Sequence, residues 1–80
     1  MIVAFVLLNI KPGKEEEFMK KLESMKDEKV KLEEGYLVYG EYDVIIKLRA
    51  ENLQDIREFV INKIRSSNYV EKSITLIVAP

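Results

Sequence analysis

The sequence predicts an α+β fold in which strands and helices follow one another in the order β-α-β-β-α-β. Strand-length apolar runs lie at both ends and in the middle of the chain, and two amphipathic segments separate them. Eighty residues suffice for one small domain, so residues 1–80 are expected to form a single unit. Right-handed crossovers then place both helices on one face of a four-stranded antiparallel sheet, the ferredoxin-like arrangement.

The predicted strands are separated by clear breaks in the apolar pattern. They cover residues 2–10, about 30–39, 42–50 and about 70–78. Between the second and third strands, Gly40-Glu41 predicts a tight hairpin, because Gly accepts the positive φ that such a corner needs. On the third strand, one face is expected to carry Val44, Ile46 and Leu48.

The helices are predicted from their start signals and apolar stripes. The first follows Pro12-Gly13 and has three glutamates in its first turn, where the helix dipole favours negative charge. The second begins at the N-cap residue Asn52, with Asp55 three residues later. The expected buried stripes are Phe18, Leu22 and Met25 in the first helix, and Leu53, Ile56, Val60 and Ile64 in the second.

Composition excludes several classes of function. The chain has 13 basic and 14 acidic residues, so it offers phosphate backbones no excess of positive charge. It contains no Cys and no His, which excludes thiolate and imidazole metal sites and Ser-His or Cys-His nucleophile pairs. The apolar N-terminus is too short to span a bilayer and lacks a basic leader. We therefore expect a cytoplasmic protein with no cofactor and no membrane association.

The first and last strands are apolar at both alternating sets of positions. Helices that cover one face of the sheet leave the second apolar set exposed, and such patches usually mark interfaces. We therefore expect the sheet to pack against a second copy of itself.

Four polar residues are candidates for a binding site. Glu41 and Asp43 are two residues apart and can share one face of a strand. Asp43 either contacts a ligand or has a structural role, in which it accepts hydrogen bonds from turn amides or pairs with Lys47. Both interpretations stay open. Ser73 and Thr75 alternate on the last strand, where hydroxyls bind a small ligand or simply favour β structure.

Three tyrosines, Tyr36, Tyr39 and Tyr42, surround the hairpin, with Phe5 on a neighbouring strand. Aromatic residues on a sheet of this topology also stack bases in RNA-binding domains. The basic signature of those domains is absent, so we interpret these side chains as core or dimer-interface residues.

Three segments resemble the effector-binding (RAM) domain of the Lrp/AsnC family of transcription regulators. They are Pro12-Gly13-Lys14-Glu15-Glu16 after the first strand, Tyr39-Gly40-Glu41-Tyr42-Asp43-Val44 at the hairpin, and residues 70–78 at the end. The resemblance covers nearly the whole chain. It implies a domain that dimerises through its sheet and assembles into rings of eight or ten subunits.

The same resemblance implies that an amino-acid effector binds near the hairpin, at the boundary between dimers. Residue by residue, it assigns ligand binding to Gly40, Glu41, Tyr42, Asp43, Ser73 and Thr75. Full-length regulators of the family carry an N-terminal helix-turn-helix, whereas this sequence begins with a strand. We therefore expect no direct DNA binding, and regulation by co-assembly with a full-length regulator.

Two other functions remain as alternatives. Small dimeric α+β barrels include cofactor-less monooxygenases, which usually rely on an Asn, Trp or His in the barrel pocket. The sequence has no Trp and no His, so we expect a protein that is not an enzyme. The second alternative is a purely structural assembly module without a ligand.

Overall fold

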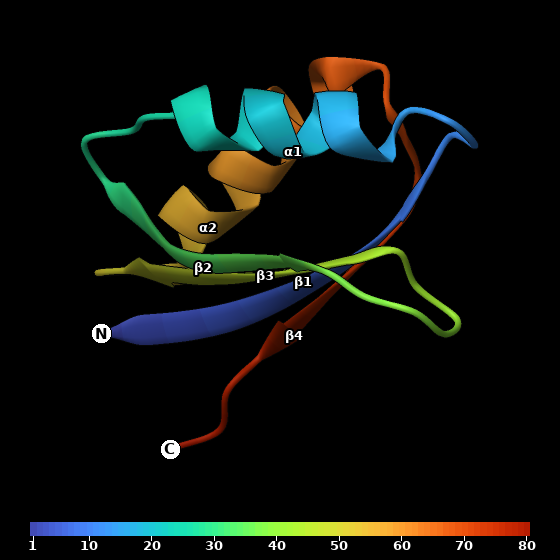
Figure 1. Cartoon of the computed structure of the whole chain (residues 1–80). Helices are drawn as coiled ribbons and strands as arrows, with labels where there is room; N and C mark the ends of the chain where they lie inside the picture. The colour runs from blue at the N-terminus through green and yellow to red at the C-terminus, as the bar shows by residue number, and fades with distance from the viewer.

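The structure is a computed structural model that describes all 80 residues. Its elements are β1 (Ile2–Ile10), α1 (Glu15–Ser24), β2 (Val30–Leu37), β3 (Val44–Ala50), α2 (Leu53–Phe59) and β4 (Val70–Ile77). The α2 helix continues into a π-helical turn, η1 (Val60–Ile64), and a 3₁₀ turn, η2 (Arg65–Ser67). The strands form one antiparallel sheet in the order β2-β3-β1-β4, and both helices lie on the same side of it (Figure 1). The predicted ferredoxin-like fold is confirmed.

The core lies between the sheet and the helices. On the two central strands, every second side chain is buried beneath the helices and the others are half-exposed. Strand register aligns these buried positions, because Val6 lies opposite Ile46 of β3 and opposite Thr75 of β4. The buried apolar residues are Ala4, Val6, Leu8, Ile10, Phe18, Leu22, Val30, Val44, Ile46, Leu48, Ala50, Ile56, Phe59, Val60 and Ile64.

The α1 helix ends before the last residue of its predicted apolar stripe. Phe18 and Leu22 are buried as expected, but the helix ends at Ser24. Met25 has extended backbone, and its N–H donates to the carbonyl oxygen of Leu22 at 3.1 Å. Gly35 of β2 lies beneath this end of α1, where an added Cβ would come within 2.9 Å of Leu22 Cδ2. A glycine at this position therefore allows the helix to pack closely on the sheet.

The α2 helix begins where the sequence predicts. The side-chain oxygen of Asn52 accepts a hydrogen bond from the Asp55 N–H at 3.0 Å, which confirms the N-cap. The expectation that Leu53 lies in the core is wrong: it is 45% exposed, because it is the first residue of the helix and precedes the turns that cover the sheet. Phe59 is buried in the stripe instead.

The tight hairpin predicted at Gly40-Glu41 is wrong. Strand β2 ends at Leu37 and β3 begins at Val44, so residues 38–43 form a wider loop that projects beyond the sheet (Figure 1). The Val38 N–H donates to the Asp43 carbonyl oxygen at 2.8 Å and closes this loop. Gly40 does have a positive φ, +141°. On the β1 side of the loop, the Asp43 N–H donates to the Leu8 carbonyl oxygen at 2.8 Å.

Candidate functional site

The face of the sheet opposite the helices, which we call the open face, carries an apolar patch over β1 and β4. Phe5 lies opposite Leu76, and Leu7 lies opposite Ile74, so these side chains point to the same side. Leu76 is 53% exposed and Val78, just beyond β4, is 49% exposed. The apolar patch consists of Val3, Phe5, Leu7, Ile45, Ile74, Leu76 and Val78.

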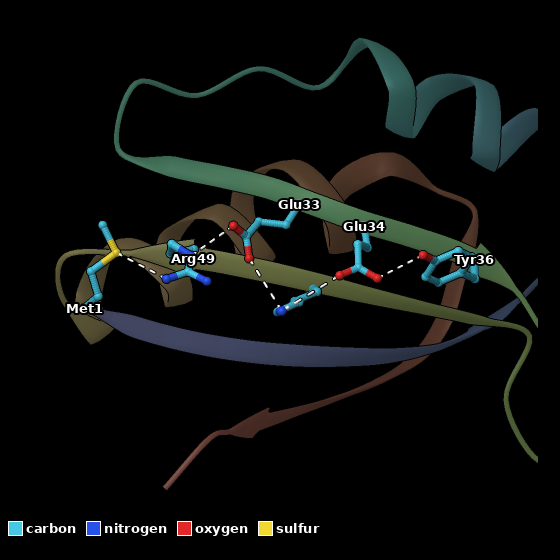
Figure 2. A network of polar contacts seen from close by, with 6 residues as sticks. Met1, Glu33, Glu34, Tyr36 and Arg49 are labelled. Atoms are coloured by element: carbon cyan, nitrogen blue, oxygen red, sulfur yellow. Dashed lines mark hydrogen bonds and ion pairs between the residues drawn. The ribbon is translucent and has the colours of Figure 1, made fainter. Parts of the chain in front are cut away.

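An ion-pair network covers β2 and β3 on the other half of the open face, as Figure 2 shows. Glu33 receives a hydrogen bond from Arg49 Nε at 2.9 Å, and Lys47 Nζ lies 3.8 Å from carboxylate oxygens of both Glu33 and Glu34. The Tyr36 hydroxyl donates to Glu34 at 2.8 Å. The alternative in which Lys47 pairs with Asp43 is therefore wrong, because strand register places Lys47 directly opposite Glu34.

The network changes the acidity of two of its members. The hydrogen bond from Arg49 lowers the pKa of Glu33 below its ordinary value of 4.5, with further lowering by the charges of Arg49, Lys47 and Lys31. The hydrogen bond to Glu34 raises the pKa of Tyr36, because ionised Tyr36 would lose that bond and face a carboxylate. At neutral pH Glu33 is therefore ionised, and Tyr36 keeps its proton as a hydrogen-bond donor.

The Glu33 pair predicts a pH-dependent contribution to stability. Because folding lowers the pKa of Glu33, its contribution is complete well above its ordinary pKa of 4.5 and is lost as the pH falls through the lower folded value. The melting temperatures of the wild type and Glu33→Gln should therefore differ by a constant amount above about pH 5.5. This difference should shrink at lower pH. Thermal denaturation from pH 2 to pH 8 measures this. A difference that does not change with pH would contradict the assignment.

Asp43 fastens the loop after β2 to the end of β1. Its Oδ2 accepts a hydrogen bond from the Ile10 N–H at 2.8 Å, and Oδ1 accepts none from the chain. Nearby, the Asn9 side-chain amide donates to the Glu41 carbonyl oxygen at 2.8 Å. One carboxylate oxygen of Asp43 thus has a structural partner, which supports the turn-stabilising interpretation and leaves the second oxygen for a ligand.

Asp43 also lines a hollow of about 400 Å³ beside the N-terminus of α1, which we call the acidic hollow. Glu15 and Glu16 from the first turn of α1 line it together with Asp43, so three carboxylates surround one space. Its full lining is Gly13, Glu15, Glu16, Leu37, Val38, Tyr39 and Asp43. This concentration of negative charge suits a cationic group such as an ammonium.

Ser73 and Thr75 lie elsewhere. Each faces the helix side of β4, because Ser73 lies opposite Leu8 and Thr75 opposite Val6, and both of those side chains are buried beneath the helices. They line a cleft of about 300 Å³ between η1 and β4, which we call the arginine cleft. The lining of the arginine cleft is Arg57, Val60, Ile61, Arg65, Ser73 and Thr75.

The six residues expected to bind a ligand are therefore distributed over separate places in one chain. Gly40, Glu41 and Tyr42 lie in the loop, Asp43 in the acidic hollow, and the two hydroxyls in the arginine cleft. Sequence reasoning missed the place of Glu15 and Glu16 beside Asp43. The Pro12-Gly13 turn was the available signal, because it starts α1 at the end of β1 that also holds Asp43.

The three tyrosines near the loop do not form one aromatic surface. Tyr36 is half-exposed in the ion-pair network, Tyr42 is partly buried, and Tyr39 is fully exposed at the loop tip. Tyr39 is not a core residue, because it lies in the loop that projects past the sheet, and its interpretation as a dimer-interface residue stays a prediction. No helix of this chain has the length and apolar character that crossing a bilayer requires.

The sequence matches the family of Lrp/AsnC ligand-binding domains over residues 3–79. The chain belongs to this family. It is 32% identical over 77 residues to the HTH-type transcriptional regulator FL11 of Pyrococcus furiosus, a match that covers 96% of the chain and 48% of the regulator. This Lrp/AsnC ligand-binding domain therefore spans about half the length of that curated relative.

Solved structures share the fold of this Lrp/AsnC ligand-binding domain. Hypothetical protein PHS023 from Pyrococcus horikoshii is 40% identical, with a TM-score of 0.83 over 100% of this chain and 92% of its own. AsnC of E. coli is 26% identical, with a TM-score of 0.84 over 99% of this chain and 51% of its own. The predicted resemblance to the RAM domain is confirmed by the family match, and the curated relatives are transcription regulators rather than enzymes.

Proposed function

We propose that this Lrp/AsnC ligand-binding domain senses an amino acid and assembles with further copies through the open face of its sheet. The observation that carries the proposal is the acidic hollow, where Asp43, Glu15 and Glu16 surround about 400 Å³ at the end of the sheet. An ammonium group in this space makes charge-assisted hydrogen bonds with carboxylates, which are stronger than bonds between neutral groups. The Oδ1 atom of Asp43, which accepts no hydrogen bond from the chain, is the natural acceptor.

The other end of the ligand is held by a neighbouring copy in this proposal. Ser73 and Thr75 do not line the acidic hollow of their own chain. A ligand of amino-acid size that uses both sets of residues therefore lies between two copies, with its ammonium in one acidic hollow and its carboxylate at the hydroxyls of the next copy. Binding at such a boundary links ligand concentration to assembly, because the ligand stabilises only the assembled form.

The open face supplies the first contact of this assembly. A second copy placed on the apolar patch removes the exposed parts of Phe5, Leu7 and Leu76 from water. Each contributes less than the roughly 1.5–3 kcal/mol that complete burial of a fully exposed apolar side chain gives, because all three are partly buried already. Larger rings of eight or ten subunits extend the same proposal. Longer relatives such as FL11 share this domain, so co-assembly with a full-length regulator is the proposed route to gene regulation. The proposal includes no direct contact between this domain and DNA.

A thermal-shift screen of the twenty amino acids at pH 7 tests ligand binding. At least one amino acid should raise the melting temperature, because a ligand at 100 times its Kd stabilises the folded state by about 2.7 kcal/mol. For a domain of this size, that is a rise of about 10–20 °C. The matched control is the N-acetylated form of the same amino acid, which lacks the ammonium and should produce a much smaller shift, because only its carboxylate remains to bind. Absence of any shift would support a structural assembly module instead.

A further inference from the structure

Two arginines of the arginine cleft have no partner within the chain. Arg57 of α2 and Arg65 of η2 are exposed, and neither forms an ion pair or a side-chain hydrogen bond. The other arginine of the chain, Arg49, is paired with Glu33. Both unpaired guanidinium groups line the same 300 Å³ cleft, and no carboxylate lines it with them. Positive charge is therefore concentrated there although the whole chain carries a net charge of −1.

The π-helical turn brings the two arginines to one side of the helix. In a regular α-helix with 3.6 residues per turn, positions eight residues apart differ in direction by roughly 80°. The wider η1 turn, Val60–Ile64, lies between Arg57 and Arg65 and absorbs about one extra residue. The eight residues from Arg57 to Arg65 therefore turn the helix by about as much as seven residues of a regular α-helix. That is nearly two full turns, so both arginines project toward the same side. Single π-helical turns of this kind occur frequently at functional sites.

The opposite wall of the cleft supplies hydroxyl groups. Ser73 and Thr75 alternate on β4, and both face the helix side of the sheet. Arg65 and Ser73 also line an adjoining hollow with Val70, Glu71 and Lys72, which contributes one further positive and one negative side chain. Two guanidinium groups with hydroxyl donors opposite them match the requirements of an oxyanion, since guanidinium binds carboxylate and phosphate in a two-pronged geometry.

We infer that the arginine cleft is a binding site for an oxyanion, a phosphate or carboxylate group, held by Arg57 and Arg65 with Ser73 and Thr75 opposite. The inference adds two arginines to the hydroxyls used in the proposed function, but it does not require an ammonium group or the acidic hollow. It applies equally to the carboxylate end of an amino acid and to an anion that carries no amine.

Nuclear magnetic resonance titrations with inorganic phosphate and, separately, with succinate test the inference. At constant ionic strength, each probe that binds should shift the amide signals of Ser73 and Thr75 in a saturable manner. Arg57→Gln and Arg65→Gln should each weaken binding about tenfold or more, because each removes charge-assisted hydrogen bonds. Arg65→Lys keeps the charge but loses the two-pronged geometry, so it should also weaken binding.

The matched control is Lys20→Gln, which removes the same charge from an exposed position on α1 and should leave the affinity unchanged. Binding of phosphate alone identifies a phosphate site, and binding of succinate alone a carboxylate site. No saturable shift with either probe, or equal binding by both glutamine variants and the wild type, would overturn the inference. Neither probe carries an ammonium, so Asp43→Asn should bind them normally even if no amino acid binds the protein.

Discussion

In the proposed assembly, replacing Leu76 by lysine should release a folded monomer of about 9.4 kDa. Leu76 lies opposite Phe5 in the apolar patch and is 53% exposed in the single chain. A lysine there places a charge in the proposed interface, where burial of an unpaired charge is strongly unfavourable. In the monomer the same lysine remains in water, so the fold should lose only about 0.5 kcal/mol.

Sedimentation velocity at micromolar concentration measures the change, with the wild type expected as a dimer or larger. Leu53→Lys is the matched control, because Leu53 is 45% exposed on the helix side and receives the same substitution. That variant should sediment like the wild type. A wild-type protein that is monomeric, or a Leu76→Lys variant that still assembles, would rule out the open face as the interface.

Two substitutions of Asp43 should separate its structural role from ligand binding. Asp43→Ala leaves the Ile10 N–H without its acceptor at 2.8 Å and should destabilise the unliganded protein by about 1–3 kcal/mol. Asp43→Asn retains a carbonyl oxygen that can accept from Ile10 but removes the negative charge. The Asp43→Asn variant is therefore expected to preserve most of the stability while strongly reducing the shift produced by an amino acid.

Melting temperatures of both variants, with and without an amino acid that stabilises the wild type, provide the measurement. Gly40→Val serves as the control for damage to the loop, because its φ of +141° is strained for a residue with a Cβ, at a cost of about 1–3 kcal/mol. If Asp43→Asn keeps the full ligand shift, the charge of Asp43 does not bind the ligand and its role is confined to the loop.

The core was predictable because it depends on alternation, which is a local property. Val44, Ile46 and Leu48 are two residues apart, so a single strand identifies the face that they share. The Asn52 cap was predictable for the same reason, since its partner Asp55 lies only three residues away. The family resemblance likewise rests on short segments whose residues are close together in the sequence.

The loop and the site depend on contacts between distant residues. The loop after β2 is held to β1 by the Asp43 carboxylate, which accepts a hydrogen bond from the N–H of Ile10, 33 positions away in the sequence. The partner of Lys47 follows from the register between β2 and β3. This register shifts between Leu32 and Glu34, and no local pattern in the sequence predicts the shift. The alignment of Arg57 with Arg65 likewise depends on a π-helical turn that an α-helical periodicity does not predict.

The central position of β1 has a consequence for how the chain folds during synthesis. The first strand of the sheet pairs with the last, and the pair Ala4 and Ile77 brings together residues far apart in the sequence. Until β4 has been synthesised, one edge of β1 has no partner and is free to pair with other strands. Such distant pairings also slow folding, because a long loop must close before the contact forms. The sheet can therefore be completed only after β4 has emerged from the ribosome.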